Sequence, residues 1–297
     1  DSNEVCLRVT DVPSTTSVRS CHQASDCSVW EYCDNASATC ALRSKTCADA
    51  TCSGHGPCVW SDVNTKQTVQ TCNVLDSNCV AECACSAGYG GASCASSLET
   101  LESQRATRAQ FLAGLGAVTL NDDISAENVA VWSVSLEALS QDPNELPESS
   151  LGTVTTLAQS ILSSAGNTAD LSYQATIGVL SAVDAASRVT HTSNATHGNN
   201  TAVLETLTLY GDLIGTQLAP AQDGVELVYD NFRLTAAKQS GNTNFSLSVP
   251  QTVLEKAYGS AASVVTIASS TNESDAEGDE VAVSVISTAI SSYGALG

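Results

Sequence analysis

Eight of the thirteen cysteines lie in one short stretch, residues 47–94, and this density of cysteines constrains the fold more than any other feature. A segment of fewer than about fifty residues buries too little apolar surface to fold unaided. Disulfide bonds supply the missing stability, at roughly 2–4 kcal/mol each. We therefore expect a small module that is held together by disulfides and lies outside the reducing cytosol.

The end of this stretch follows the pattern C-x-x-G-aromatic-x-G-x-x-C at every position, from Cys85 through Gly88, Tyr89 and Gly91 to Cys94. The glycines suit turn positions with positive φ, which other residues adopt at a cost. The tyrosine gives a small module one large side chain to pack. The whole pattern resembles that of an epidermal-growth-factor-like (EGF-like) module.

The EGF-like resemblance implies the disulfides Cys47–Cys58, Cys52–Cys83 and Cys85–Cys94. Two cysteines then remain in a long insertion, Cys72 and Cys79, and we expect them to bond with each other. A zinc site is the alternative, but the spacing is not C-x2-C…C-x2-C and no histidine stands at ligand spacing. We interpret His55, in a Gly-His-Gly turn, as a tolerated loop residue.

Residues 1–46 form a second cysteine-rich module, in which five or six residues separate Cys21, Cys27, Cys33 and Cys40. Four cysteines allow three pairings, of which we favour Cys21–Cys33 with Cys27–Cys40. Thirteen cysteines cannot all pair within one chain, so Cys6 is left over. Either its partner has been lost upstream, or it is an unpaired buried thiol, or it bonds to a neighbouring subunit.

Residues 95–222 contain no cysteine, are rich in Ala, Ser and Gly, and show helical periodicity. This pattern predicts an α-helical bundle domain of five antiparallel helices. A capping cluster at 122–125 precedes the second helix. The fourth helix is predicted from about Ala169 to Arg188. Apolar side chains mark the first helix (Leu98, Leu101, Phe111, Leu112, Leu115), the second (Val129, Trp132, Leu136, Leu139), the third (Leu151, Val154, Leu157, Ile161), the fourth (Leu171, Ile177, Leu180, Val183) and the fifth (Val203, Leu207, Tyr210, Ile214).

Residues 223–297 switch to a two-residue period, which predicts a β-rich domain with a sheet or sandwich-like fold. Four apolar runs carry this period, at 225–229, 245–249, 264–267 and 281–286. The acidic turn at 272–280 is interpreted as a solvated loop, since it lacks the ligand spacing of a known calcium loop. The chain is therefore expected to be multidomain and α+β overall. Its lack of methionine and its abrupt end lead us to expect a piece of a longer parent.

The chain has 32 acidic and 11 basic residues, a net charge of −21. This balance argues against nucleic acid and anionic membranes as partners, because both require a basic face. We find no run of eighteen apolar residues and expect no membrane span in this chain. Known catalytic motifs are absent, and no plausible nucleophile lies beside a histidine (His22, His55, His191, His197). We expect no enzyme, no cofactor and no metal.

Five N-glycosylation sequons occur, at Asn35, Asn194, Asn199, Asn244 and Asn272. The disulfides independently indicate secretion, so we expect N-glycans at these asparagines and O-glycans elsewhere on the Ser/Thr-rich surface. Calcium-binding EGF-like modules have acidic or amide residues just before the first cysteine. Here residues 42–46 are basic, so we expect no calcium in this module.

The order of motifs narrows the resemblance. It comprises Cys52-Ser-Gly-His-Gly-x-Cys58, Ser61-Asp-Val-Asn64-Thr, the Cys72…Cys79 insertion, Cys83-x-Cys85, a helix with Arg105 and Arg108, and Ala126-Glu-Asn-Val-Ala-Val-Trp132-Ser. Over about residues 47–150 this order resembles the sexually induced protein family of diatoms and its relatives, the shaft proteins of tripartite mastigonemes, the flagellar hairs of stramenopiles. The resemblance implies an extracellular glycoprotein that assembles into such hairs, with relatives linked to gamete-surface recognition.

We therefore expect a structural subunit of an extracellular glycoprotein filament at the cell or flagellar surface, built by head-to-tail contacts between copies of itself or related subunits. The alternative is a cell-surface adhesion or gamete-recognition ectodomain that acts as a binding module. A carbohydrate-active enzyme would need two carboxylates in a cleft, and no such pair stands out from the acidic surface.

Overall fold

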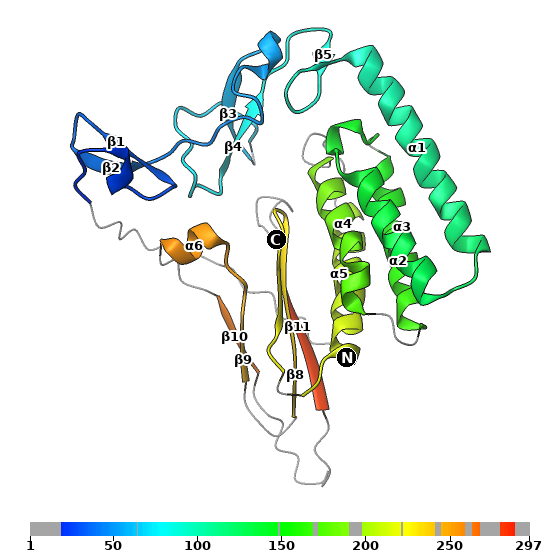
Figure 1. The fold of residues 1–297 in the computed structure, drawn as a ribbon. Helices are drawn as coiled ribbons and strands as arrows, with labels where there is room; N and C mark the ends of the chain where they lie inside the picture. Colours follow the sequence, from blue (N-terminus) through cyan, green and yellow to red (C-terminus); the bar gives the residue numbers. More distant parts are fainter. Residues whose placement is uncertain are drawn as a thin grey trace.

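The computed structural model describes residues 19–288 of the 297-residue chain, except 64, 148, 169–171, 190–197, 221, 241–244, 259–262 and 268–279. The protein is a mixed α+β structure. Disulfide-linked hairpins come first in sequence, α-helices follow, and antiparallel strands end the described part of the chain (Figure 1).

The N-terminal region contains three two-stranded antiparallel ladders and two short 3-10 helices. Strand β1 (Glu31–Asp34) pairs with β2 (Thr39–Leu42), β3 (Cys58–Asp62) with β4 (Cys79–Cys83), and β5 (Tyr89–Gly90) with β6 (Ser96–Ser97). The 3-10 helices are η1 (Ala24–Asp26) and η2 (Cys52–Gly54). Isolated two-stranded ladders are marginally stable in water, so this region depends on its covalent cross-links.

Five α-helices pack around one hydrophobic core. They are α1 (Leu98–Asn121), α2 (Ala126–Ser140), α3 (Ser150–Gly166), α4 (Ile177–Val189) and α5 (Gly198–Gln217), with the 3-10 helices η3 (Pro143–Glu145) and η4 (Tyr173–Thr176) between them. Serines cap the first two helices. The Ser97 side chain accepts the Thr100 N–H, and the Ser125 side chain accepts the Asn128 N–H. Each cap satisfies an N–H group that the helix itself leaves unpaired.

The largest side chains in this core are Trp132 and Tyr210, and both are almost wholly buried. Val129 and Leu136 are buried with Trp132, on the face that the sequence pattern predicts for the second helix. The Tyr210 hydroxyl donates to the Tyr173 carbonyl oxygen at 3.0 Å. Burial raises the pKa of Tyr210, so the hydroxyl stays protonated and keeps donating this bond.

The fourth helix begins later than its periodicity predicts. The expected start is near Ala169, whereas the structure has the 3-10 helix η4 and then α4 from Ile177. The Ser172 side chain accepts the Gln174 N–H and begins η4. Serine competes with helical hydrogen bonding in this way, and a count of apolar spacings does not detect it. The fifth helix, α5, begins at Gly198.

A three-stranded antiparallel sheet packs against the helices, in the strand order β11 (Glu280–Thr288), β8 (Phe232–Ser240), β7 (Val225–Val228). A separate antiparallel pair consists of β9 (Phe245–Ser248) and β10 (Val264–Ile267), with the short helix α6 (Val253–Ala257) between them in sequence. Phe232, Leu234 and Ala236 belong to the same buried cluster as the helix side chains. The change of sequence period at residue 223 is therefore not a break in the core.

Strand β8, the centre of this sheet, is missing from the four strands that the sequence pattern predicts. All four predicted runs are strands in the structure, as β7, β9, β10 and β11. In β8 the alternation fails because Thr235 and Ala237 are buried as well as Leu234 and Ala236. A strand that is covered on both faces loses its two-residue period, and alanine adds little strand signal.

A buried polar contact joins α4 to the turn between β7 and β8. The Asn231 backbone N–H donates to Asp184 Oδ1 at 2.9 Å. The Asn231 side-chain amide donates to the same oxygen and to the Asp184 carbonyl oxygen, both at 3.0 Å. Both residues are at most 6% exposed. Because a buried carboxylate without donors would be costly, this contact favours one placement of the sheet on the helices.

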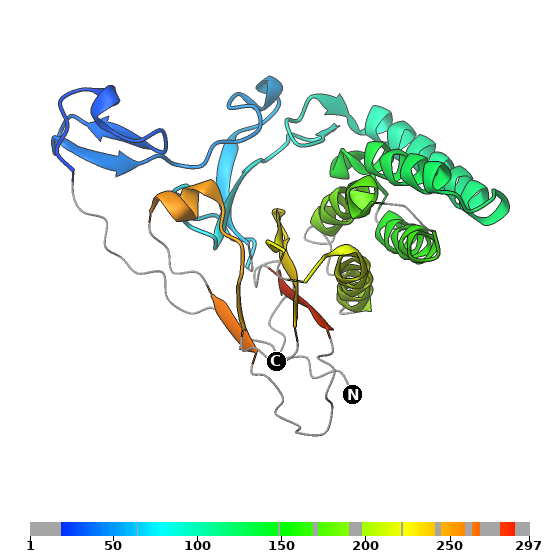
Figure 2. The ribbon, with the colours of Figure 1, turned by 60° about the horizontal axis from the view of Figure 1, so that its bottom comes forward.

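The first hairpin also contacts the far end of the described chain. Ser28 Oγ lies 2.9 Å from the Tyr258 hydroxyl, which follows α6 and is 230 positions away in sequence. Figures 1 and 2 both show α6 near the β1–β2 hairpin. Burial at this contact, with the Glu31 carboxylate nearby, raises the pKa of Tyr258.

Close packing of α2 on α4 predicts that Gly178→Ala lowers the free energy of unfolding. A Cβ at Gly178 would lie 3.0 Å from the Ser133 carbonyl oxygen and 2.9 Å from Glu137 Oε2. The two helices must then separate, at a net cost of about 1–2 kcal/mol after the gain in helix propensity. Chemical denaturation followed by circular dichroism measures the change.

Gly114→Ala is the matched control, because a Cβ at Gly114 meets no atom within 4 Å. This substitution should raise the free energy of unfolding by about 0.5–1 kcal/mol through helix propensity alone. Equal effects of the two substitutions would contradict the close α2–α4 contact.

Candidate functional site

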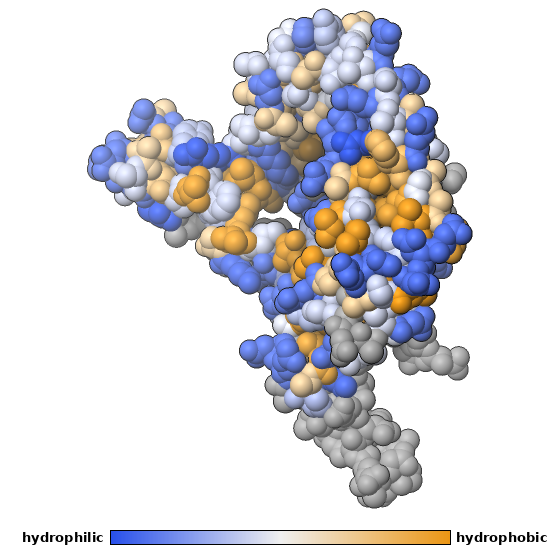
Figure 3. Space-filling model, turned by 45° about the vertical axis from the view of Figure 1, so that its right-hand side comes forward, coloured by the Kyte–Doolittle hydropathy of each residue, from blue (hydrophilic) through white to orange (hydrophobic). Residues whose placement is uncertain are grey.

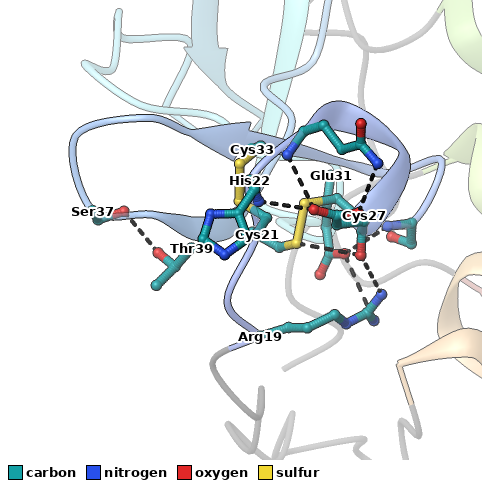
Figure 4. The surroundings of a disulfide bond; sticks show 12 residues. Arg19, Cys21, His22, Cys27, Glu31, Cys33, Ser37 and Thr39 are labelled. Atoms are coloured by element: carbon teal, nitrogen blue, oxygen red, sulfur yellow. Dashed lines mark hydrogen bonds and ion pairs between the residues drawn. A yellow bond between two sulfur atoms is a disulfide. The ribbon is translucent and has the colours of Figure 1, made fainter.

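The first disulfide-linked hairpin is built on β1 and β2 (Figure 4). Cys33 and Cys40 lie directly opposite each other in the ladder. Each nevertheless bonds to a cysteine that precedes the hairpin, as Cys21–Cys33 and Cys27–Cys40, with Cα–Cα distances of 5.8 and 5.6 Å. These are the pairs that the sequence analysis favours. They attach the segment 21–27 to both strands.

Carboxylates fix the backbone around these disulfides. Asp26 Oδ2 accepts the backbone N–H groups of His22 and Gln23 at 2.8 and 3.1 Å. Glu31 Oε2 accepts the Ser28 N–H at 2.9 Å. These donated hydrogen bonds lower the pKa of both carboxyl groups. The acids next to the first hairpin therefore stabilise its loops.

In residues 47–94 the cysteines themselves form the core. The bonded pairs are Cys47–Cys58, Cys52–Cys83, Cys85–Cys94 and Cys72–Cys79. Cys52 and Cys94 are completely buried, and Cys72 is 1% exposed. The structure thus brings together the three pairs that the EGF-like resemblance implies and pairs the two cysteines of the insertion with each other.

The glycines of the turn motif have the backbone conformation that the sequence analysis expects. Gly88 and Gly91 have φ angles of +91° and +86°, a region that glycine enters without steric cost. Another glycine permits a close approach, because a Cβ at Gly56 would overlap the Ala84 carbonyl oxygen. The module is therefore compact around its small residues as well as its sulfur atoms.

The interpretation of His55 as a tolerated loop residue is wrong. Its ring stacks on Tyr89, with ring centroids 3.6 Å apart and planes inclined by 11°. Its Nδ1–H donates to the Cys94 carbonyl oxygen at 3.2 Å. Tyr89 remains 36% exposed, so it packs on a neighbouring ring at the surface. The spacing of the two residues along the chain gives no signal of this contact.

Lys45 has a role that the sequence analysis missed. Its Nζ donates to the carbonyl oxygens of Asp76 and Cys79 at 2.7 and 2.8 Å. Its own carbonyl oxygen accepts the Trp60 indole N–H at 2.9 Å. Burial lowers the pKa of Lys45. The ammonium group therefore connects the 72–79 insertion to the segment that links the two modules.

Two groups of cysteine sulfurs lie within 4.8 Å of one another, as metal ligands would: Cys21, Cys27 and Cys33 in one, Cys47, Cys52 and Cys83 in the other. Every one of these cysteines is in a disulfide. Metal binding requires a thiolate, which an oxidised cysteine does not offer. Each group is therefore a pair of neighbouring disulfides.

Two surface cavities lie among the helices. One, of about 440 Å³, is lined by parts of α3 and α5 together with Ser172 and Tyr173. The other, of about 370 Å³, lies between α1 and α3. Among the described residues that line them, none is a carboxylate or a histidine. These linings supply no pair of groups for general acid–base catalysis.

The glycosylation sequon at Asn35 lies exposed in the turn between β1 and β2. The hydroxyl of its third residue, Ser37, donates to Asp34 Oδ2 at 2.7 Å. Asn199 lies at the beginning of α5. Four of the predicted disulfide and glycosylation sites lie outside the described residues: Cys6, Asn194, Asn244 and Asn272.

Six disulfides in the described N-terminal region indicate a secreted or extracellular protein. None of the helices in the described ranges combines the length and the apolar character needed to cross a membrane.

Loop length predicts unequal effects of removing two disulfides from residues 47–94. Cys52–Cys83 spans 31 positions and Cys72–Cys79 spans 7. Because each disulfide restricts the unfolded chain, its removal should lower the free energy of unfolding by about 4 kcal/mol for Cys52–Cys83 and by about 2.5 kcal/mol for Cys72–Cys79. Replacing both cysteines of each pair by alanine should therefore reduce hydrogen-exchange protection of β3 more for Cys52–Cys83. Equal loss in both variants would contradict this, and α2 amides serve as the internal control.

The Asp49 carboxylate predicts an acid-sensitive turn. It accepts the backbone N–H groups of Thr51 and Ser53 at 2.9 and 2.7 Å, which lowers its pKa from 3.8 to about 2. A depressed pKa means that the ionised group stabilises this turn above pH 3.8 and that the contribution is lost as the pH falls through 2. NMR titration of the Asp49 side chain checks this, and Asp49→Asn should remove that pH dependence. A midpoint near 3.8 would contradict the contact.

No protein-family model and no curated protein matches this sequence.

Proposed function

We propose that the chain is a structural subunit of an extracellular glycoprotein filament, of the kind found in the mastigonemes that its motifs resemble. The observation that carries this proposal is the number of covalent cross-links, six disulfides within residues 21–94. A fibre outside the cell must keep its shape under shear without repair. Cross-links give small modules that durability, because they limit the unfolded states available to the chain.

In this proposal residues 47–94 are an EGF-like module and residues 95–222 an antiparallel helical bundle. The three framework disulfides and the positive φ angles of Gly88 and Gly91 support the first part. The common buried core of α1 to α5 supports the second. Both parts present rigid surfaces, and repeated head-to-tail contact between such surfaces produces a filament when the rotation does not close a ring.

Cys6 provides a covalent link between successive subunits in this proposal. The chain has thirteen cysteines, and the six disulfides use twelve of them. No second cysteine of the same chain is left for Cys6. An oxidising compartment favours a bond to another chain over a persistent free thiol.

Glycans would cover the outside of the filament. The exposed sequon at Asn35 lies at the tip of a hairpin, where a bulky sugar chain meets no core packing. A glycan there would exclude neighbouring chains from the β1–β2 turn. The assembly contacts must therefore use other surfaces.

The second candidate, an adhesion or gamete-recognition ectodomain, is favoured by one observation. Several large apolar side chains are exposed on α1 and α2, with Phe111 at 59% and Val134 at 61%. Large exposed apolar patches mark interaction sites in soluble proteins. A recognition module would use such a face to bind a different protein.

The filament proposal predicts that Cys6→Ser abolishes disulfide-linked multimers. Wild-type protein should give covalent multimers in non-reducing electrophoresis and fibres in negative-stain images of the native material. The serine variant should give only the monomer band, because Cys6 alone lacks a partner in its own chain. Asn35→Gln, which leaves the cysteines unchanged, is the control. Isolated particles in the native material would contradict the filament, and a fully alkylatable Cys6 in intact fibres would contradict the covalent link.

A further inference from the structure

Five large apolar side chains are exposed along the half of the α1–α2 hairpin that carries its connecting loop. They are Phe111, Val118, Ile124, Val131 and Val134, with exposed fractions between 42% and 61%. We call this set the α1–α2 apolar face. Figure 3 shows hydrophobic side chains gathered over the helical side of the molecule. Single exposed apolar residues are common, but a group on one hairpin marks an interaction site.

The backbone register places these side chains at matching heights on the two helices. The short connecting loop 122–125 brings the end of α1 at Asn121 and the start of α2 at Ala126 to about the same height. Counting about 1.5 Å per residue from there, Phe111 and Val134 lie within about 3 Å of the same height. The same count makes Val118 nearly level with Val131. The exposed side chains therefore follow the same length of both helices.

Leu120 lies apart from this face. It follows Val118 by two residues, about 200° further around the helix. It is 81% exposed and stands in the wall of the cavity of about 370 Å³ between α1 and α3.

The end of this face at the connecting loop is acidic, because Asp122, Asp123 and Glu127 are exposed there. The two helices contain two arginines, Arg105 and Arg108. Both arginines are engaged within the protein, Arg105 with the Asn144 carbonyl oxygen and Arg108 with Glu145. Asp122 and Asp123 are exposed next to Ile124 and extend the negative end of α1.

We propose that the α1–α2 apolar face docks an amphipathic, basic helix of a partner protein. The apolar side of such a helix would cover the exposed side chains, and its Lys and Arg residues would meet the acidic end of the face. A second copy of the chain fits less well. Each copy has a net charge of −21, and described cations such as Arg43, Lys45 and Arg233 are bound to internal partners. This proposal stands whether or not the chain forms filaments.

The experiment titrates the full-length protein with two synthetic amphipathic helices, one of leucine and lysine and one of leucine and glutamate. Calorimetry should detect binding of the lysine peptide alone. The variant F111Q/V118Q/V134Q should weaken that binding by at least about tenfold, equivalent to about 1.4 kcal/mol. V253Q, which changes a 77% exposed valine on α6, should leave it unchanged. The bound peptide should protect amides in 111–134 from hydrogen exchange.

L120Q is a second control, because it removes an 81% exposed apolar side chain from the opposite side of α1. It should leave both the binding of the lysine peptide and the circular dichroism unchanged. Equal binding by the triple variant and V253Q would overturn the proposal, because the attraction would then be a general effect of net charge. Dimerisation of the wild type in sedimentation that the triple variant abolishes would also overturn it, in favour of a second copy.

Discussion

The cross-linking of sulfur replaces the hydrophobic core in the first part of this protein, and the rest of the N-terminal architecture depends on it. Cys52 and Cys94 are fully buried, in positions that aliphatic side chains occupy in a larger domain. The strands there are at most five residues long and form isolated pairs. Turn glycines, the Asp49 and Asp26 hydrogen bonds and the Lys45 ammonium refine a shape that the disulfides impose. Removal of the cross-links would leave too little apolar burial to retain it.

The second part of the chain is stabilised in a different way. Trp132, Tyr210 and Phe232 belong to one continuous core, to which the helices α1 to α5 and the three-stranded sheet all contribute. Two features position its layers. Gly178 lets α4 approach α2 closely, and the buried contact between Asp184 and Asn231 connects α4 to the sheet. The two parts meet where β6 continues directly into α1, with Ser97 as the N-cap of the helix. The direction of α1 is therefore coupled to the orientation of the first part.

Local patterns predicted much of this fold because their causes are local. The EGF-like resemblance implied three of the disulfides, and the spacing around Trp132 indicated the buried face of α2. Contacts between distant segments left no such pattern. Strand β8 has no alternation because both of its faces are covered, and the stacking of His55 on Tyr89 depends on how the disulfides fold two turns together. The exposed face around Phe111 was also missed, since a helical period does not distinguish an inward from an outward apolar residue. Cys6 and most sequons lie outside the described residues.

The contact between Ser28 and Tyr258 has a mechanical consequence. One hydroxyl pair contributes about 1 kcal/mol net, less than twice the thermal energy, whereas the hairpin that carries Ser28 is internally cross-linked by two disulfides. A bending load on this hairpin would therefore release the hydroxyl contact long before it deformed the hairpin itself. Residues 21–42 would then behave as a stiff lever arm on a soft support, and compliance would be concentrated at one point of the molecule.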